Sequence, residues 1–327
     1  MVSCPWAALV KTADIAVLVE TWLSKGQCDM QEWQLSGYTH HALCHPRRGG
    51  KGRPSAGISV YVRNSLDKHV SIVASDLSLG VLYLKISSVL PTSRPDILLA
   101  CCYLPTSAGD PFVDLMHGLA MHGRGCTLLV VGDLNARTGQ LRDIPLPQDK
   151  INSDDPHNLV DRDMALVPRH RANRDMLVNP RGRSCVDLCL SSGMAIVNGR
   201  TPGDLSGAFT VFSKSKQAAN STPDLILASA ALFPHFAELV VGKPEIWDSM
   251  SDHVPVTLHL KNVSWGGGQR LHPNIPKLQL SSINKPGHVS LPRSERPMCR
   301  LVSMQSPIKS RRLLSLSTLP SAVLELF

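Results

Sequence analysis

The sequence predicts an α+β fold in which two β-sheets pack together with helices outside. Short β-rich segments bounded by Gly, Pro, Asn and Asp recur along residues 1–260. Some of these segments alternate between apolar and polar residues and others are continuously apolar, a mixture that is typical of sheets covered by helices. A composition of 43% hydrophobic and 18% charged residues in a chain of 327 residues excludes a disordered or coiled-coil protein.

Eight segments have strand character. The segments 57–62 and 256–260 alternate, as half-exposed strands do, whereas 97–104 and 127–131 are continuously apolar, as strands covered on both faces are. In chain order the predicted strands are 15–19, 57–62, 79–86, 96–104, 126–132, 207–212, 224–228 and 253–260.

Helical periodicity is sparser than strand character. The segment 111–121 places apolar residues at helical spacing, and 186–194 fits a short helix. Together with the strands, these helices predict one domain over residues 1–260. Residues 140–183 form a long polar stretch, which in a compact domain is usually functional or disordered, and both interpretations stay open.

The positive charge of the chain lies in its last part. Residues 261–327 hold ten basic and two acidic residues and so carry the whole formal net charge of +8, because residues 1–260 hold 24 of each kind. This part is also rich in Pro and Ser and has no sustained periodicity. We expect a basic, flexible tail that either contacts nucleic-acid phosphates or is simply solvated.

Membrane insertion and secretion are not indicated. The longest apolar run, 97–104, is far shorter than the roughly 20 residues that span a bilayer, and the first residues lack a charged segment followed by an apolar one. We therefore expect an intracellular, reducing location.

Cysteine and histidine spacing gives no clear metal site or disulfide framework. The nine cysteines are an odd number without a CxxC pair, so we expect mostly buried thiols. His40, His41, Cys44 and His45 form the best zinc-like cluster, but no second ligand pair lies at finger-like spacing. A polar loop is the favoured interpretation of this cluster, and whether it binds anything stays open.

Acidic and amide residues recur at the ends of the predicted strands, where a rigid scaffold presents catalytic groups. Each residue alone has a simpler explanation, because Asp and Asn end strands by bonding the local backbone. Together they have the composition of a site for a hard cation. The residues are Glu20, Asp133, Asn135, Asp224, Asp252 and His253.

These residue types suit the hydrolysis of a phosphodiester. Mg²⁺ takes one or two carboxylates and keeps several waters, and Glu20 and Asp252 suit that role. A water that attacks phosphorus must lose a proton, and charge on the phosphoryl oxygens must be stabilised.

Each step has a candidate residue. Asp133 can take the proton of the water, and Asn135 can orient that water. His253 can donate to the phosphoryl oxygens once Asp224 fixes its tautomer, and Tyr103 can donate its phenol to the phosphate.

Several of these residues lie in motifs of a known family. VETWL (19–23), YLP (103–105), GDLNAR (132–137), TPDLIL (222–227) and SDHVPV (251–256) occur in the order and rough spacing of the endonuclease/exonuclease/phosphatase superfamily. Within it, ETWL, GDLNARTG and the segment 186–210 resemble the apurinic-type endonuclease domain of LINE-type retrotransposons. The resemblance covers about residues 10–260.

The resemblance implies a four-layer α/β sandwich and a DNA-nicking activity that depends on a divalent metal, Mg²⁺ with Mn²⁺ as a substitute. It implies DNA as the partner and the nucleus as the location, with neither a membrane nor an obligate protein partner. The residues that match family positions are Glu20 and Asp252 for metal, Tyr103, Asp133, Asn135, Asp224 and His253 for catalysis, and Arg174 and Asn179 for substrate.

The sequence departs from the family pattern in two places. The family begins with an interior strand that ends in a metal-site Asn, and this sequence starts after it. We therefore expect an N-terminally truncated domain over 1–260 with one sheet edge exposed. The second departure, Pro223 and Leu225 around Asp224, is minor because Pro is tolerated at the start of a strand.

Two other functions stay open. A phosphomonoesterase of the inositol-phosphate type shares GDLNAR, but its Trp-x-Asp-Arg signature is absent ahead of Asp224. A catalytically inactive remnant of a mobile element would explain the late start, the change of composition near Asn262 and the lack of a reverse-transcriptase pattern after 260.

Overall fold

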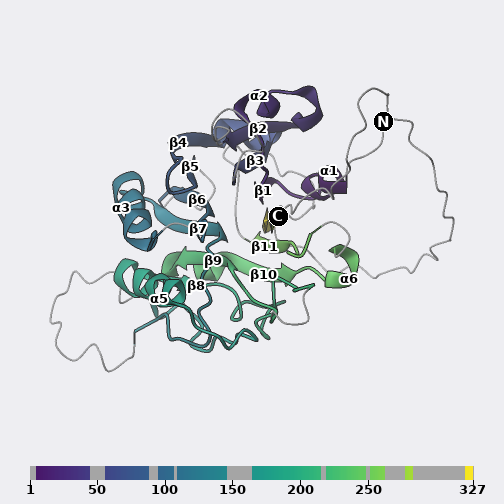
Figure 1. Cartoon of the computed structure of the whole chain (residues 1–327). Coiled ribbons are helices and arrows are strands. Elements are labelled where there is room, and N and C mark those ends of the chain that lie inside the picture. Colours follow the sequence, from purple (N-terminus) through teal and green to yellow (C-terminus); the bar gives the residue numbers. More distant parts are fainter. Residues whose placement is uncertain are drawn as a thin grey trace, which may run out of the picture.

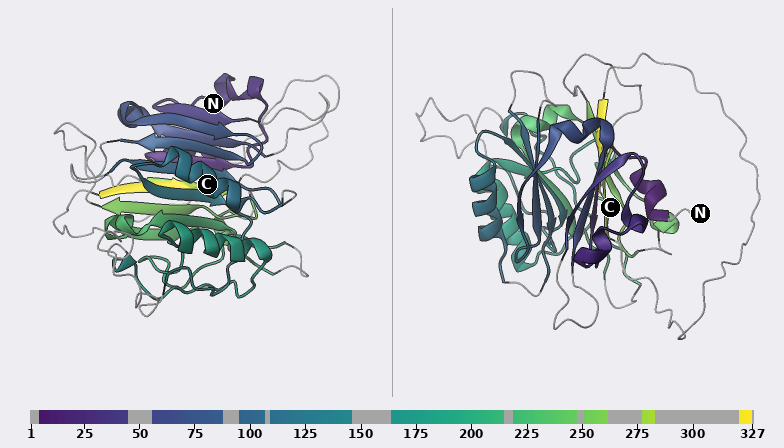
Figure 2. Two further views of the ribbon diagram at one scale, coloured as in Figure 1. Left: turned by 90° about the vertical axis from the view of Figure 1, so that its left-hand side faces the viewer. Right: turned by 90° about the horizontal axis from the view of Figure 1, so that it is seen from above.

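The structure is a four-layer sandwich, which confirms the predicted fold class. Two β-sheets lie face to face, with helices on both outer faces (Figure 1, Figure 2). The structure, a computed structural model, describes residues 5–44, 56–87, 95–106, 109–145, 164–214, 219–247, 251–261, 277–282 and 321–326.

Sheet B has six strands in the order β4-β5-β6-β7-β9-β8. Its two central strands, β6 and β7, run parallel, and β7 pairs antiparallel with β9. The bounds are β4 Val70–Asp76, β5 Val81–Ile86, β6 Ile97–Tyr103, β7 Thr127–Asp133, β8 Met194–Ile196 and β9 Asp224–Ser229.

Sheet A consists of two groups of strands, in the orders β12-β1-β3-β2 and β10-β11-β13. β12 pairs parallel with β1, and β13 pairs antiparallel with β11. The bounds are β1 Ile15–Val19, β2 Tyr38–Leu43, β3 Ile58–Arg63, β10 Phe236–Val241, β11 Val256–Lys261, β12 Lys277–Ser282 and β13 Ser321–Leu326.

Helices cover the two outer faces (Figure 2). α3 and α5 pack on sheet B, and α1 and α6 lie on the side of sheet A. The bounds are α1 Pro5–Val10, α2 Lys25–Cys28, α3 Phe112–His122, α5 Pro180–Ser192 and α6 Pro244–Trp247, with 3-10 turns η1 Gln31–Trp33, η3 Asn64–His69 and η5 Ala230–His235.

The alternation of side chains along each strand builds separate cores. In β6, Leu99 belongs to the core between the sheets, whereas Leu98 packs under the helices of sheet B. This explains why β6 and β7 are continuously apolar, since both faces of these strands are covered. β3 is also covered on both faces, because Tyr61 is buried against Trp6 of α1, so the expectation that it would be half-exposed is wrong.

Most predicted elements occur close to their expected positions. Seven of the eight predicted strands contain a strand, but 207–212 does not, since in that segment Val211 makes only isolated bridges. The predicted helix at 186–194 begins earlier, at Pro180, because Asn179 caps it and Pro180 suits a first helical position. The strands β2, β4, β8 and β10 were not predicted.

The tail contributes strands rather than only flexible chain. β12 and β13 both lie within residues 261–327 and pair with β1 and β11. The sheet edges of β1 and β11 where an exposed edge was expected are therefore paired with tail segments.

The cluster of His40, His41, Cys44 and His45 does not form a zinc site in the described part of the chain. Cys44 forms a disulfide with Cys28, which corrects the expectation of free thiols at these positions. His40 stacks on Tyr61, and burial lowers its pKa to about 4. His45 lies outside the described residues.

One glycine is required where β7 ends beside β6. Gly132 has a φ of 145°, and a Cβ there would lie 1.8 Å from the carbonyl oxygen of Cys102. Only glycine fits this close approach of two strands. Gly26, by contrast, has no atom within 4 Å of a built Cβ.

We predict that Gly132→Ala lowers the free energy of unfolding by about 2 kcal/mol or more, because either the backbone or β6 must shift. Urea unfolding of this variant and of the matched control Gly26→Ala measures the difference. Equal stabilities of the two variants would contradict the close approach.

Candidate active site at the shared edge of the two sheets

Three neighbouring strands of sheet B end at the same edge with a polar residue each. Tyr103 at the end of β6 is in register with Asp133 at the end of β7, and Asp133 is in register with Asp224 at the start of β9. Because neighbouring strands lie about 4.8 Å apart, the register alone places these three residues in a row with Asp133 in the middle.

Sheet A supplies a partner for each outer residue of that row. Glu20 directly follows β1, and its Oε1 accepts a hydrogen bond from the Tyr103 hydroxyl. His253 precedes β11, and its Nδ1 lies 2.9 Å and 3.1 Å from the two carboxylate oxygens of Asp224. Two side-chain pairs thus bridge the sheets, one on each side of Asp133.

Asn135 fixes the carboxylate of Asp133. Its backbone N–H donates to Asp133 Oδ1 at 2.9 Å, and its Nδ2 donates to Asp133 Oδ2 at 3.2 Å and to the Leu104 carbonyl at 3.0 Å. Asn135 has a φ of 49°, a left-handed conformation that Asn tolerates better than most residues. These bonds make Asn135 a positioning residue for Asp133.

Burial and crowded negative charge set the protonation of Asp133. The side chain is buried, and its residue is only 3% exposed. Burial, followed by the charge of Asp224, raises the pKa of Asp133 to about 7, although His253 and the Asn135 amide oppose the rise. A carboxylate with a pKa close to neutral can accept a proton and release it again at physiological pH.

His253 is protonated at neutral pH. Burial by itself would lower its pKa, but the charge and hydrogen bond of Asp224, together with the charges of Asp133 and Asp252, raise the pKa to about 10. The bond from Nδ1 to Asp224 leaves Nε2 as the nitrogen that can donate to a bound anion.

The negative charge gathered at this edge of the sheets favours a cation. Glu20 adds to the negative charge that raises the pKa of Asp133, so several carboxylates repel one another here. Among the described residues no group of three or more His, Cys, Asp or Glu side chains could hold a metal ion. A site with one or two carboxylates suits Mg²⁺, which keeps several waters, and Glu20 would be the ligand.

Sequence analysis missed Arg181, in the first turn of α5. Its Nη1 donates to the carbonyls of Leu104 at 3.2 Å and Pro105 at 3.0 Å. Its Nε and Nη2 are buried and have no hydrogen-bond partner among the described residues. Burial lowers the pKa of Arg181, and the charge of Asp133 opposes that effect.

A signal for Arg181 exists in the sequence. The helix dipole disfavours a basic residue in a first turn, where α5 has no acidic residue. An Arg at such a position does not stabilise the helix, so it is a candidate for a role outside the helix. Because the sequence predicts that this helix begins at residue 186, it does not identify Arg181 as a first-turn residue.

The remaining predicted site residues lie around this centre. Asn179 accepts hydrogen bonds from the N–H groups of Gly182 and Arg137 and donates to the Asn135 carbonyl, so it supports the site from behind. Arg174 is exposed. The charge of Asp252 acts on His253. DNA contacts of Arg174 and Asn179 stay predictions.

The polar stretch 140–183 is ordered where the structure describes it, over 140–145 and 164–183. Arg137 of the GDLNAR motif forms a bidentate ion pair with buried Asp175, with bonds of 2.8 Å and 2.6 Å. This pair attaches the segment before α5 to the loop that carries Asp133 and Asn135, and so links the stretch to the site.

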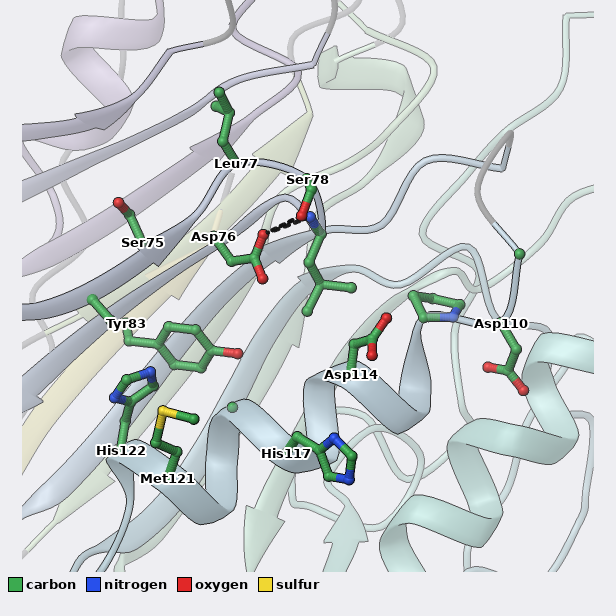
Figure 3. A pocket seen from close by; sticks show the side chains of 15 residues that line it. Ser75, Asp76, Leu77, Ser78, Tyr83, Asp110, Asp114, His117, Met121 and His122 are labelled. Atoms are coloured by element: carbon green, nitrogen blue, oxygen red, sulfur yellow. Dashed lines mark hydrogen bonds between the residues drawn. The ribbon is translucent and has the colours of Figure 1, made fainter.

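A cavity of about 960 Å³ lies elsewhere, between the β4–β5 turn and α3 (Figure 3). Its lining includes Asp76, Asp114 and His117. The Tyr83 hydroxyl has no hydrogen-bond partner within the described residues. None of the strand-end residues lines this cavity, so it is separate from the candidate active site.

The profile of the Endonuclease/Exonuclease/phosphatase family matches residues 5–253. No curated protein matches the chain. In the described residues, no helix is long and apolar enough to cross a membrane.

The solved structures that resemble this chain have low sequence identity to it. The AP endonuclease LMAP from Leishmania major is 16% identical with a TM-score of 0.52, covering 77% of this chain and 80% of that one. The APE2 catalytic domain of Xenopus laevis is 16% identical with a TM-score of 0.51, covering 79% and 87%. The endonuclease domain of TRAS1, a telomere-specific non-LTR retrotransposon, is 16% identical with a TM-score of 0.43, covering 76% and 85%.

The chain therefore belongs to the Endonuclease/Exonuclease/phosphatase family. Members of this family are hydrolytic nucleases and phosphatases.

We predict that Asp224→Ala lowers the pKa of His253 from about 10 to below 6.5, because burial then acts on the imidazole without its main opposing charge. Titration of the His253 ring protons by NMR measures this change, with His259 of β11 as an internal reference. A His253 pKa that stays near 10 in the variant would show that Asp224 does not set the charge of the imidazole.

Proposed function

We propose that this chain is a divalent-metal-dependent endonuclease that cuts phosphodiester bonds in DNA, of the kind found in LINE-type retrotransposons. The observation that carries the proposal is the row of Tyr103, Asp133 and Asp224, in which a carboxylate with a pKa of about 7 lies beside an imidazolium. A base and a cationic donor at one edge are what phosphodiester hydrolysis requires.

The chemistry follows from the protonation states. Asp133 takes a proton from water, and the oxygen of that water attacks phosphorus in line with the leaving oxygen. The bond from phosphorus to that oxygen breaks, and the leaving oxygen takes up a proton from solvent. His253 donates from Nε2 to a non-bridging oxygen and stabilises the charge that grows on it.

Substrate position depends on two further donors. Arg181 has two unpaired guanidinium nitrogens, counted among the described residues, and these suit a phosphate group. The Tyr103 hydroxyl donates its proton to Glu20 Oε1, so it becomes a donor to phosphate only when that bond is released. When bound at Glu20, a Mg²⁺ ion would neutralise charge on the phosphate oxygens.

DNA as the substrate is supported by the relatives and by charge. Two similar solved structures with TM-scores above 0.5 are an AP endonuclease and the catalytic domain of APE2. The resemblance of ETWL, GDLNARTG and 186–210 to LINE-type endonuclease domains favours DNA over a small phosphomonoester. The basic residues of 261–327 add a positive charge that favours a polyanion.

We predict that Asp133→Asn and His253→Ala each reduce nicking of supercoiled plasmid by about 10² to 10³ or more, with DNA binding nearly unchanged, because both groups act mainly in the transition state. Gel-based nicking in Mg²⁺, with an EDTA control, measures the rates. Wild-type nicking that survives EDTA, or full activity of the His253 variant, would refute the mechanism.

Substitution of the proposed metal ligand should affect activity differently from substitution of the proposed base. In Glu20→Gln the loss of a carboxylate weakens Mg²⁺ binding, so higher Mg²⁺ or Mn²⁺ should restore part of the activity. The Asp133 and His253 variants are the matched controls, because added metal should not restore them. Equal recovery of all three variants would remove the assigned roles.

The two shifted pKa values predict the pH dependence of the rate. In saturating Mg²⁺, activity should fall as pH drops through the pKa of Asp133, which the cation lowers by at least one unit from its metal-free value of about 7, and fall again as pH rises through about 10, where His253 loses its proton. The plateau therefore lies between these values. Residual activity of His253→Ala should lack the upper limb, and an unchanged upper limb in that variant would assign it to another group.

A further inference from the structure

Sheet A has a gap between the two strands that carry active-site residues. β1 pairs with β3 on one side, and β11 pairs with β10 on one side. On their other sides both strands pair with segments of the tail, β12 with β1 and β13 with β11. Figure 2 shows β13, in yellow, between the strands of the N-terminal part and the green strands near β11.

The gap is as wide as one strand. β12 pairs with β1 but also has Cα atoms within 8 Å of β11, and β13 pairs with β11 but also has Cα atoms within 8 Å of β1. Two strands side by side in the gap would hold β12 and β11 about 9.6 Å apart, since each spacing is about 4.8 Å. β12 and β13 are therefore alternative occupants of one position.

The backbone groups of β1 and β11 that face the gap need hydrogen-bond partners. With the tail segments in place, every residue of β1 is at most 3% exposed, so its gap-facing N–H and C=O groups depend on a paired strand for their hydrogen bonds. Buried backbone groups without a partner are costly, so a strand must pair there.

We propose that residues 321–326 are this strand, and that by filling the gap they hold Glu20 and His253 at the spacing that the active site uses. The claim about the spacing rests on the proposed function, whereas the claim about the strand does not. β1 ends one residue before Glu20, and β11 begins three residues after His253, so the occupant of the gap determines how far apart these residues lie.

Sequence and register favour 321–326 over 277–282. A strand covered on both faces is favoured by apolar residues, and SAVLEL has four where KLQLSS has two. Ala322, Leu324 and Leu326 are in register with Leu260, Leu258 and Val256, which belong to the core between the sheets.

The shorter connection favours the other segment, but weakly. About 15 residues (262–276) separate β11 from β12, and about 59 residues (262–320) separate it from β13. Loop closure then favours β12 by about eightfold, because its probability falls with the 3/2 power of length. The additional apolar residues of 321–326 outweigh a factor of this size.

Cross-linking of the full chain tests the occupant without any need for activity. Thr257 is in register with Glu325, so Thr257→Cys with Glu325→Cys should form a disulfide under mild oxidation. Thr257→Cys with Ser321→Cys is the matched control, because Ser321 is in register with Lys261, four residues away. Peptide mass spectrometry should find at least tenfold more cross-link in the first pair.

A second pair of cysteine substitutions tests the alternative occupant of the gap, β12. Ala16 is in register with Gln279, so Ala16→Cys with Gln279→Cys reports β12 in the gap. Cross-linking of this pair in preference to the Thr257 and Glu325 pair would overturn the proposal in favour of 277–282. Failure of both pairs would overturn the one-strand gap itself.

The effect on spacing is read from the backbone amide NMR signals of Glu20 and His253. Leu324→Pro removes a ladder hydrogen bond, so in the folded protein these two signals should move from their wild-type positions, whereas general destabilisation would leave the native-state signals unchanged. Ser315→Pro, in the same tail, is the control. Loss of folding in Leu324→Pro alone would also support the strand, and unchanged amide signals of Glu20 and His253 in a folded Leu324→Pro protein would refute the claim about spacing. Neither measurement uses DNA or metal, so failure of the proposed nuclease activity would be seen separately.

Discussion

The burial of one carboxylate between two pairs that bridge the sheets is the interaction on which the rest of the site depends. Asp133 lies in the middle of three strand ends, with Tyr103 and Glu20 on one side and Asp224 and His253 on the other. Burial and neighbouring negative charge raise its pKa to about 7. The same charge keeps His253 protonated, so one electrostatic arrangement produces both a base and a cationic donor.

The fold makes this arrangement possible by placing the same edge of both sheets together. Sheet B provides the row through strand register, which fixes three residues from distant parts of the chain without any flexible connection. Sheet A provides Glu20 and His253 from two strands that do not pair with each other directly. The packing of the strands holds these like charges close together despite their repulsion, and a bound cation would weaken that repulsion.

Local patterns predicted the parts of the site but not all of their contacts. The continuously apolar segments of β6 and β7 indicated covered strands, and the strand-end positions of Asp133 and Asp224 indicated where a site could form. Arg181 was missed because the start of its helix depends on the Asn179 cap, which contacts residues far away in sequence. The segment 207–212 has the composition of a strand, but among the described residues it makes only isolated bridges. The tail strands pair in a gap between β1 and β11, which local sequence patterns do not predict.

Titration of the Asp133 carboxyl carbon by ¹³C NMR, with and without Mg²⁺, tests the central claim most directly. We predict a pKa of about 7 in the absence of metal, and a decrease of at least one unit in saturating Mg²⁺, because the cation favours the charged carboxylate. Glu20→Gln should need more Mg²⁺ for the same decrease. An Asp133 pKa near the ordinary value of about 4 without metal, or one that Mg²⁺ does not change, would contradict this account of the site.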